Sequence, residues 1–123
     1  NEANMNYWDI FETLSDAGID VALPGIKQDI CTFPYAVVQM SGTYPYAVST
    51  GLGYTLITVH CYAPLNGFRQ LGMLIERVKN ALKGLEPDLR PTGNDGVQLI
   101  NDKFRAHEGS VQYMIMRSLR SLP

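Results

Sequence analysis

Two histidines and two cysteines are the residues of this chain best suited to acid–base, nucleophilic or metal-binding chemistry. His60 and Cys61 are adjacent within residues 54–63, a segment rich in β-branched and aromatic residues that predicts a strand. Neighbours on a strand point to opposite faces, whereas a Cys–His nucleophilic pair needs both groups on the same side. We therefore expect Cys61 to be a small core residue and not a nucleophile.

The remaining candidates form no catalytic or metal-binding pattern. Cys31 is distant in sequence, and His107 falls in a predicted turn. The spacings of the two Cys and two His match no zinc motif such as a paired C-x-x-C. Residues 51–53 (Gly-Leu-Gly) lead into a strand and not into a helix, so the dipole argument for phosphate binding fails. We expect no catalytic residue, no metal and no cofactor.

The segment Thr43-Tyr44-Pro45-Tyr46 is the clearest candidate for contact with another protein. It lies within residues 42–53, a Gly-rich stretch that predicts a long loop between two strands. Tyr is enriched at interfaces because its ring buries area while its hydroxyl still finds a partner. The alternative is that these rings pack the loop against its own subunit.

The elements that must position these residues begin with a helix over residues 6–17. Asn6 can cap this helix, and Gly18 can end it. Residues 19–34 predict short extended pieces joined by turns. Strands are then expected over residues 35–41 and 54–63, because both segments are rich in β-branched and aromatic residues.

The second half of the chain predicts a helix over residues 67–83, with Asn66 as its N-cap. Its apolar residues follow a helical period and should face the core: Phe68, Leu71, Leu74, Ile75, Val78 and Leu82. Residues 85–96 are rich in turn formers. Two strands over residues 97–106 and 111–119 close the chain, joined by a hairpin turn at 107–110.

This order of elements favours an α+β fold in which an antiparallel or mixed sheet of about four strands carries two helices on one face. The core face of the central strand should consist of Thr55, Ile57, Val59, Cys61 and Ala63. We expect one domain over residues 5–123, a length typical of single domains, and interpret residues 1–4 as a leftover of an expression vector.

Charge is sparse and uneven along the chain. Charged residues make up 18% of the sequence, below the usual quarter. Residues 1–30 sum to −5, residues 31–102 to zero and residues 103–123 to +3, which gives the net charge of −2. This balance excludes a globally basic nucleic-acid binder, and no apolar run is long enough to span a membrane. The uneven ends indicate either ordinary solvated faces or a subunit that stacks head to tail.

The layout resembles that of the tail terminator and head–tail joining (tail completion) proteins of long-tailed bacteriophages and prophages. The resemblance is carried by the Pro-flanked first strand at Phe33-Pro34-Tyr35, the strand 55–63 that ends in Tyr62-Ala63, the helix 67–82 with its core stripe, and the closing hairpin. These are patterns of hydrophobicity that extend over most of residues 5–119.

The resemblance implies a structural protein and not an enzyme. Subunits of this family form a ring, commonly a hexamer, at the head-proximal end of the tail, where it contacts tail-tube and head-connector proteins. DNA would pass through the channel without sequence-specific binding, and the protein would occur in the host cytoplasm and then in the virion tail. The expected interface residues are Tyr44, Tyr46, Arg105, His107 and Arg117.

A second interpretation belongs to another class of protein. A small α+β enzyme or ligand-binding domain of ferredoxin-like type would use a pocket between sheet and helices, lined by His60 or Tyr62. A deep pocket that reaches His60 would favour this interpretation, whereas a flat sheet with an extended loop over residues 42–53 would favour the ring subunit.

Overall fold

The computed structural model describes residues 5–45 and 51–118. Within these residues the chain forms α1 (Tyr7–Asp16), β1 (Val21–Ala22), β2 (Tyr35–Pro45), β3 (Leu52–Pro64), α2 (Phe68–Lys83), β4 (Leu89–Pro91), β5 (Gly96–Asn101) and β6 (Ala106–Ser118). The α+β class is confirmed. The sheet contains six strands where about four were expected, because the two short strands β1 and β4 lie in segments expected to form short extended pieces with turns (19–34) and turns (85–96).

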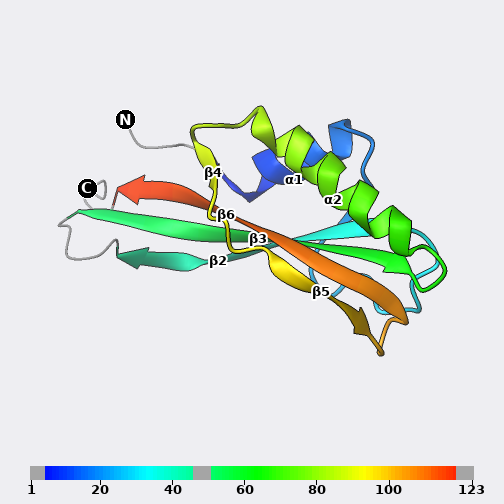
Figure 1. Ribbon diagram of the computed structural model, residues 1–123. Helices are drawn as coiled ribbons and strands as arrows, with labels where there is room; N and C mark the ends of the chain where they lie inside the picture. Colours follow the sequence, from blue (N-terminus) through cyan, green and yellow to red (C-terminus); the bar gives the residue numbers. More distant parts are fainter. Residues whose placement is uncertain (1–4, 46–50, 119–123) are drawn as a thin grey trace.

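The strands form one mixed sheet in the order β1-β2-β3-β6-β4, and β5 also pairs with β6. Only β1 and β2 run parallel; the other pairs are antiparallel. Both helices cover one side of this sheet (Figure 1), which we call the helix face. The opposite side, which we call the open face, carries no helix among the described residues.

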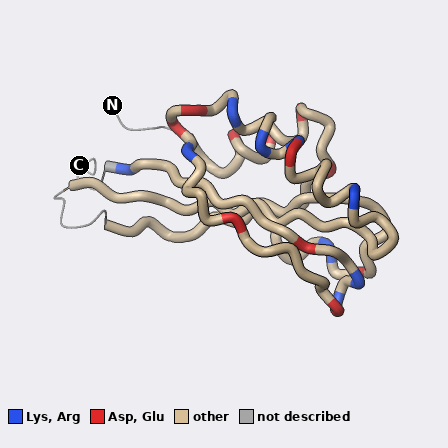
Figure 2. Tube along the Cα trace, in the orientation of Figure 1, with Lys and Arg blue, Asp and Glu red and all other residues tan. Residues whose placement is uncertain are grey.

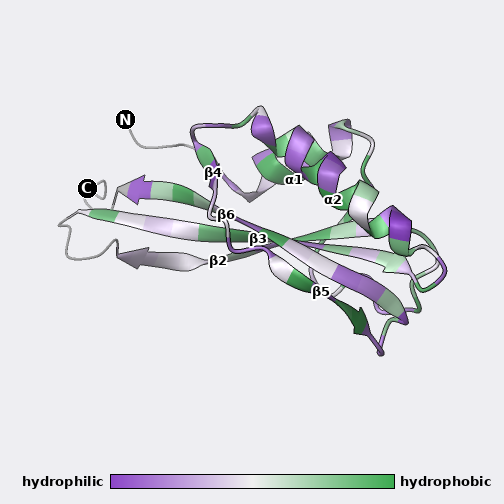
Figure 3. Ribbon diagram, viewed as in Figure 1, coloured by the Kyte–Doolittle hydropathy of each residue, from purple (hydrophilic) through white to green (hydrophobic). Residues whose placement is uncertain are grey.

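The alternation along β3 determines which residues form the core. Thr55, Ile57, Val59, Cys61 and Ala63 are buried on the helix face, as the sequence predicts. The helix α2 packs Leu71, Leu74, Val78 and Leu82 against the apolar members of this row, Ile57 to Ala63. Figure 3 shows hydrophobic and hydrophilic stretches alternating along this helix. Phe68, which the predicted stripe included, is 58% exposed, because it lies in the first turn of α2 at the end of the helix layer.

The two helices begin differently. The Asn6 side chain accepts hydrogen bonds from the backbone of Trp8 and Asp9, while the Asp9 carboxylate accepts from the Asn6 backbone at 2.8 Å, which completes a capping box. The N-cap of α2 is Gly67, without a side-chain cap, so the expected cap at Asn66 is wrong. A Cβ atom at Gly67 would overlap the Gln70 side chain.

The predicted long loop over residues 42–53 is shorter than expected. Strand β2 continues to Pro45 and β3 begins at Leu52, so Tyr44 lies in a strand opposite Tyr54. A bulge between Met40 and Thr43 shifts the register of β2 against β3 by one residue, and pairing continues beyond it to Pro45. Tyr46 lies outside the described residues. Figure 1 shows that these strand ends, together with the end of β6, extend beyond the helices.

The closing hairpin turns at residues 102–105 and not at the expected 107–110. The Asn101 side chain accepts a hydrogen bond from the Phe104 backbone at 3.1 Å, and Arg105 adopts a positive φ of 49°. His107 and Glu108 are therefore strand residues in β6. Gly109 is also within the strand, where a Cβ atom would lie 3.0 Å from the Ile75 side chain of α2. The Gly thus allows close packing of helix on sheet and does not mark a turn.

Candidate functional site: the open face of the sheet

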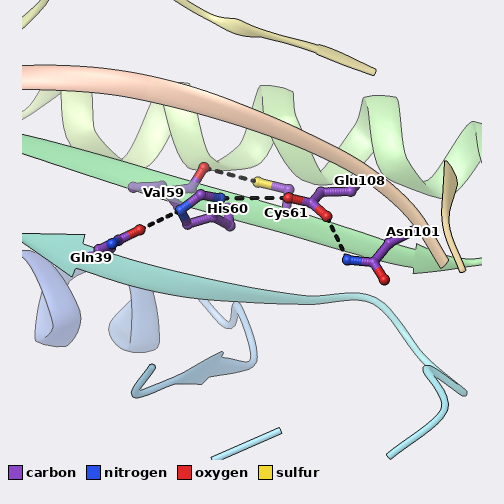
Figure 4. Close-up of polar contacts among 6 residues, drawn as sticks. All are labelled: Gln39, Val59, His60, Cys61, Asn101 and Glu108. Atoms are coloured by element: carbon purple, nitrogen blue, oxygen red, sulfur yellow. Dashed lines mark hydrogen bonds and ion pairs between the residues drawn. The ribbon is translucent and has the colours of Figure 1, made fainter. Parts of the chain in front are cut away.

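The structure places His60 and Cys61, the adjacent residues best suited to acid–base or nucleophilic chemistry, on opposite faces of the sheet. Cys61 is fully buried on the helix face, and burial raises the pKa of its thiol to about 12. His60 projects from the open face (Figure 4). No Cys–His pair forms there, since adjacent strand residues point apart. Cys31 is buried as well, packed with Tyr35 and Ala106 in a second small apolar cluster.

His60 belongs to a polar network that crosses four strands of the open face (Figure 4). Its Nε2 atom lies 2.7 Å from the Gln39 Oε1 atom of β2, and its Nδ1 atom lies 3.7 Å from the Glu108 Oε2 atom of β6. Asn101 of β5 donates a hydrogen bond of 2.9 Å to the other oxygen of Glu108. Buried His60 Nδ1 has no hydrogen-bond partner in the described part of the chain.

A cleft of about 470 Å³ lies beside this network on the open face. Its floor contains Val37, Gln39, His60 and Tyr62 from β2 and β3. Its rims come from the segment that follows β1 and from the β5–β6 turn, which contribute Lys27 and Lys103 respectively. The Cys31 backbone donates a hydrogen bond of 2.8 Å to the Phe104 carbonyl, which holds the two rims together. No carboxylate is among the described residues that line the cleft.

Aromatic rings form one wall of the cleft. Tyr35 and Tyr62 stack with ring centroids 5.0 Å apart, and Phe104 meets Tyr62 edge to face at 5.8 Å. Burial, with the nearby Glu108 charge as a smaller cause, raises the pKa of both Tyr35 and Tyr62 to about 12. Both hydroxyls therefore keep their protons at neutral pH and can donate hydrogen bonds.

A second candidate surface lies where the strands extend beyond the helices. Tyr44, Tyr54 and Met116 form one register row on the open face, and Leu56 and Met114 form the next. Leu52 lies on the same face at the start of β3 and is 45% exposed, as is Tyr44. We call these six residues the apolar strip. The expected contact residue Tyr44 is one of them, and its ring packs on that of Tyr54 at 5.7 Å.

The other expected interface residues are dispersed. Arg117 lies on the helix face of the same strand ends, where its Nε atom donates to the Thr55 hydroxyl at 3.3 Å. Arg105 is exposed in the β5–β6 turn. His107 lies at the other end of β6, with Nε2 3.1 Å from the Leu65 carbonyl and its ring against Phe68. The structure therefore does not bring these three residues together with Tyr44.

The sequence predicts the strand β5 but not the exposure of its apolar side chains. Val97, Leu99 and Ile100 of β5 are exposed, with Val97 at 78%, and Figure 3 shows the hydrophobic end of this strand. Among the described residues β5 pairs only with β6, so its outer edge is open. The available signal was the uncharged run 96–101, which is unusual for an edge strand.

Charged side chains are absent from the centre of the chain. Residues 30–68 contain no Asp, Glu, Lys or Arg. Figure 2 shows the consequence: charge collects on the helices and around the β5–β6 turn, while the extended strands carry almost none. The charges at the turn have both signs, Lys103 and Arg105 against Asp102 and Glu108.

Groups of three or more His, Cys, Asp or Glu side chains able to hold a metal ion do not occur in the described ranges 5–45 and 51–118. Neither helix in these ranges is long and apolar enough to cross a membrane.

Comparisons with known proteins identify no family and no function for the chain. No protein-family model and no curated protein sequence matches the chain. Eighteen chains of solved structures match. One of them aligns over 97% of this chain and 99% of its own length, with 16% identical residues and a TM-score of 0.47. The name of that protein describes no activity. A structural similarity with a TM-score below 0.5 supports no conclusion about function.

Proposed function

We propose that this protein is a ring-forming structural subunit of a bacteriophage or prophage tail, either a tail terminator or a head–tail joining protein. The observation that carries the proposal is the apolar strip on the open face. Monomeric proteins rarely leave large contiguous apolar patches in water, and such patches usually mark protein contacts. The strip includes Tyr44 and lies on strands that extend beyond the helices, and among the residues that pair with it in the sheet only Arg90, opposite Met114, is charged.

The exposed strand β5 supports the same proposal independently. An edge strand with exposed aliphatic residues and no charge invites pairing with another chain, and natural monomers usually protect such edges. The edge of β2, by contrast, is protected by a bulge and by Pro45. Two separate surfaces that need a cover, the apolar strip and β5, suit a subunit with neighbours on more than one side.

In this proposal the partners are further copies of the chain, commonly six in a ring, together with tail-tube and head-connector proteins. DNA passes through the channel of the ring without sequence-specific contacts, which agrees with a net charge of −2. Assembly takes place in the host cytoplasm, and the finished ring belongs to the virion tail. The proposal assigns no catalytic step to any residue.

Electron microscopy of phage particles made without this protein tests the proposal. Loss of a tail terminator should give tubes of irregular, excess length, because nothing stops tube growth. Loss of a head–tail joining protein should give complete tails separate from filled heads. Resupply of the wild-type chain should restore virions in both cases. Normal virions in the absence of the protein would contradict the proposal.

The cleft beside His60 favours a second candidate, a small-molecule binding domain. A volume of about 470 Å³ is within the range of ligand pockets, and its lining mixes aromatic and polar side chains. The cleft lies on the open face and not between sheet and helices, where the ferredoxin-like interpretation expected it. Binding of a small metabolite by the monomer, with no effect on virion assembly, would favour this candidate.

A further inference from the structure

We propose that the exposed face of helix α1 in one copy of this chain binds in the open-face cleft of a second copy. This face consists of Trp8, Glu12 and Asp16, which follow each other at intervals of four residues and are exposed. The inference rests on the proposed function and adds to it, because it names a contact between neighbouring subunits besides those of the apolar strip and β5.

The two surfaces differ in charge. Helix α1 carries three acidic residues, Asp9, Glu12 and Asp16, and no basic residue. The cleft is lined by two lysines, Lys27 and Lys103, whereas the carboxylates of Asp20, beside Lys27, and of Glu108, beside His60, lie outside its lining. Opposite charges on two faces of the same subunit favour contact between unlike surfaces and oppose contact between like ones.

Helix α1 also presents an exposed indole ring. Trp8 is 53% exposed, although Tyr7 and Phe11 pack against its ring with centroids 5.3 and 5.4 Å away. Exposed Trp side chains often become the anchors of protein interfaces when a pocket receives them. The cleft has an aromatic wall of Tyr62 and Phe104, and its 470 Å³ is ample for one indole ring.

The lysines of the cleft are available for such a contact. Lys27 lies 3.8 Å from Asp20 in a pair whose side chains are 32% and 45% exposed, a geometry that contributes little stability. Lys27 and Lys103 otherwise lie over aromatic rings, with Lys103 Nζ 5.4 Å from the Phe104 centroid. An incoming carboxylate can therefore pair with either ammonium group without breaking a buried ion pair.

The positions of the two surfaces make the contact heterologous. Helix α1 lies on the helix face, where Tyr7 donates a 2.8 Å hydrogen bond to the Val38 carbonyl, and the cleft lies on the open face. One subunit thus presents its helix to the next and receives the helix of the previous one. Head-to-tail contacts of this kind close into rings when the rotation permits.

Fluorescence tests the contact directly, because Trp8 is the one Trp of the chain. Emission and acrylamide quenching of the full chain are followed with concentration, and native mass spectrometry gives the oligomeric state of the same samples. We expect emission to shift to shorter wavelength and quenching to fall as oligomers form. Oligomers with unchanged Trp8 emission and quenching would overturn the contact while leaving the ring proposal intact. A chain that stays monomeric throughout would contradict both.

Charge reversal tests the partner surfaces. Glu12→Lys and Lys103→Glu should each weaken association about tenfold, and the double variant should restore it, since every interface then pairs the reversed charges. Glu76→Lys on α2 is the matched control and should leave association unchanged. Single variants that associate as strongly as wild type would overturn the contact. A double variant that associates more weakly than either single variant would also overturn it. If the cleft bound a small anion and not helix α1, the single variants would associate like wild type.

Discussion

Burial makes the Cys61 thiol unreactive in the folded protein. Its pKa is raised to about 12, and the pKa of the buried Cys31 thiol is raised as well. Because the thiolate is the reactive form, we expect neither cysteine to react quickly with Ellman's reagent in the folded protein at neutral pH. Both should react after unfolding in guanidinium. Rapid labelling of Cys61 in the folded state would show that the core is open at β3.

A second prediction at the residue scale concerns the two Asn that precede the helices. Asn6→Ala removes a capping box and should lower the free energy of unfolding by about 1 kcal/mol. Asn66→Ala is the matched control, because the N-cap of α2 is Gly67 and Asn66 is exposed. Urea unfolding of both variants measures the difference. Equal losses of stability would contradict the assignment of the caps.

These two residues also show what local patterns can predict. Asn6 and Asn66 stand in similar sequence contexts, and both could cap a helix. Only Asn6 does so, because the chain before α2 turns through a hydrogen bond of 2.8 Å from the Gly67 backbone to the Pro64 carbonyl, at the end of β3. The local turn that follows β3 thus decided between two similar capping signals.

At the scale of elements, the turn between β5 and β6 is strained at Arg105. A side chain at a φ of 49° is unfavourable, and a β-branched one more so. We expect Arg105→Val to be less stable than Arg105→Gly by about 1 kcal/mol or more, as measured by thermal unfolding. Lys103→Val, in the same turn without a positive φ, provides the comparison and should cost less than Arg105→Val. The reverse order would contradict the position of the turn.

The elements predicted well from the sequence are those in which apolar residues recur at a regular spacing over many residues. The faces of β3 and the stripe of α2 follow from residue spacing alone, because each is buried on one side only. The hairpin turn was misplaced because Gly109 indicated a turn, whereas it is required for close packing beneath Ile75. Strands β1 and β4, with two and three residues, are too short to show any period and depend on their neighbours.

At the scale of the whole molecule, buried phenols and thiols link stability to pH. Burial raises the pKa of Tyr35, Tyr62 and Tyr113 from 10.0 to about 12, and that of Cys61 from 9.0 to about 12. The unfolded chain therefore loses these protons first as pH rises. Stability from these groups is complete below pH 9 and decreases between pH 9 and about 12. Urea unfolding at neutral pH and above pH 10 measures this decrease; equal stability would contradict it.

The candidate site was only partly accessible from sequence. Tyr44 and the uneven charge could be identified, because exposed aromatic residues and charge runs are local features. The apolar strip could not, since it joins β2, β3 and β6 through the register of the sheet. The cleft likewise combines Lys27 and Lys103, which are distant in the chain and meet only because two rims fold over the open face.

The central claim is that this chain assembles with copies of itself through the open face of its sheet. Native mass spectrometry of the full chain, over a range of concentration and ionic strength, tests it most directly when wild type is compared with Leu56→Lys in the apolar strip. Met73→Lys, at an exposed apolar residue of α2, is the matched control. We predict closed oligomers of one size for wild type and the control, and monomers for Leu56→Lys. A wild-type protein that remains monomeric, or a Leu56→Lys protein that assembles as wild type does, would contradict the account.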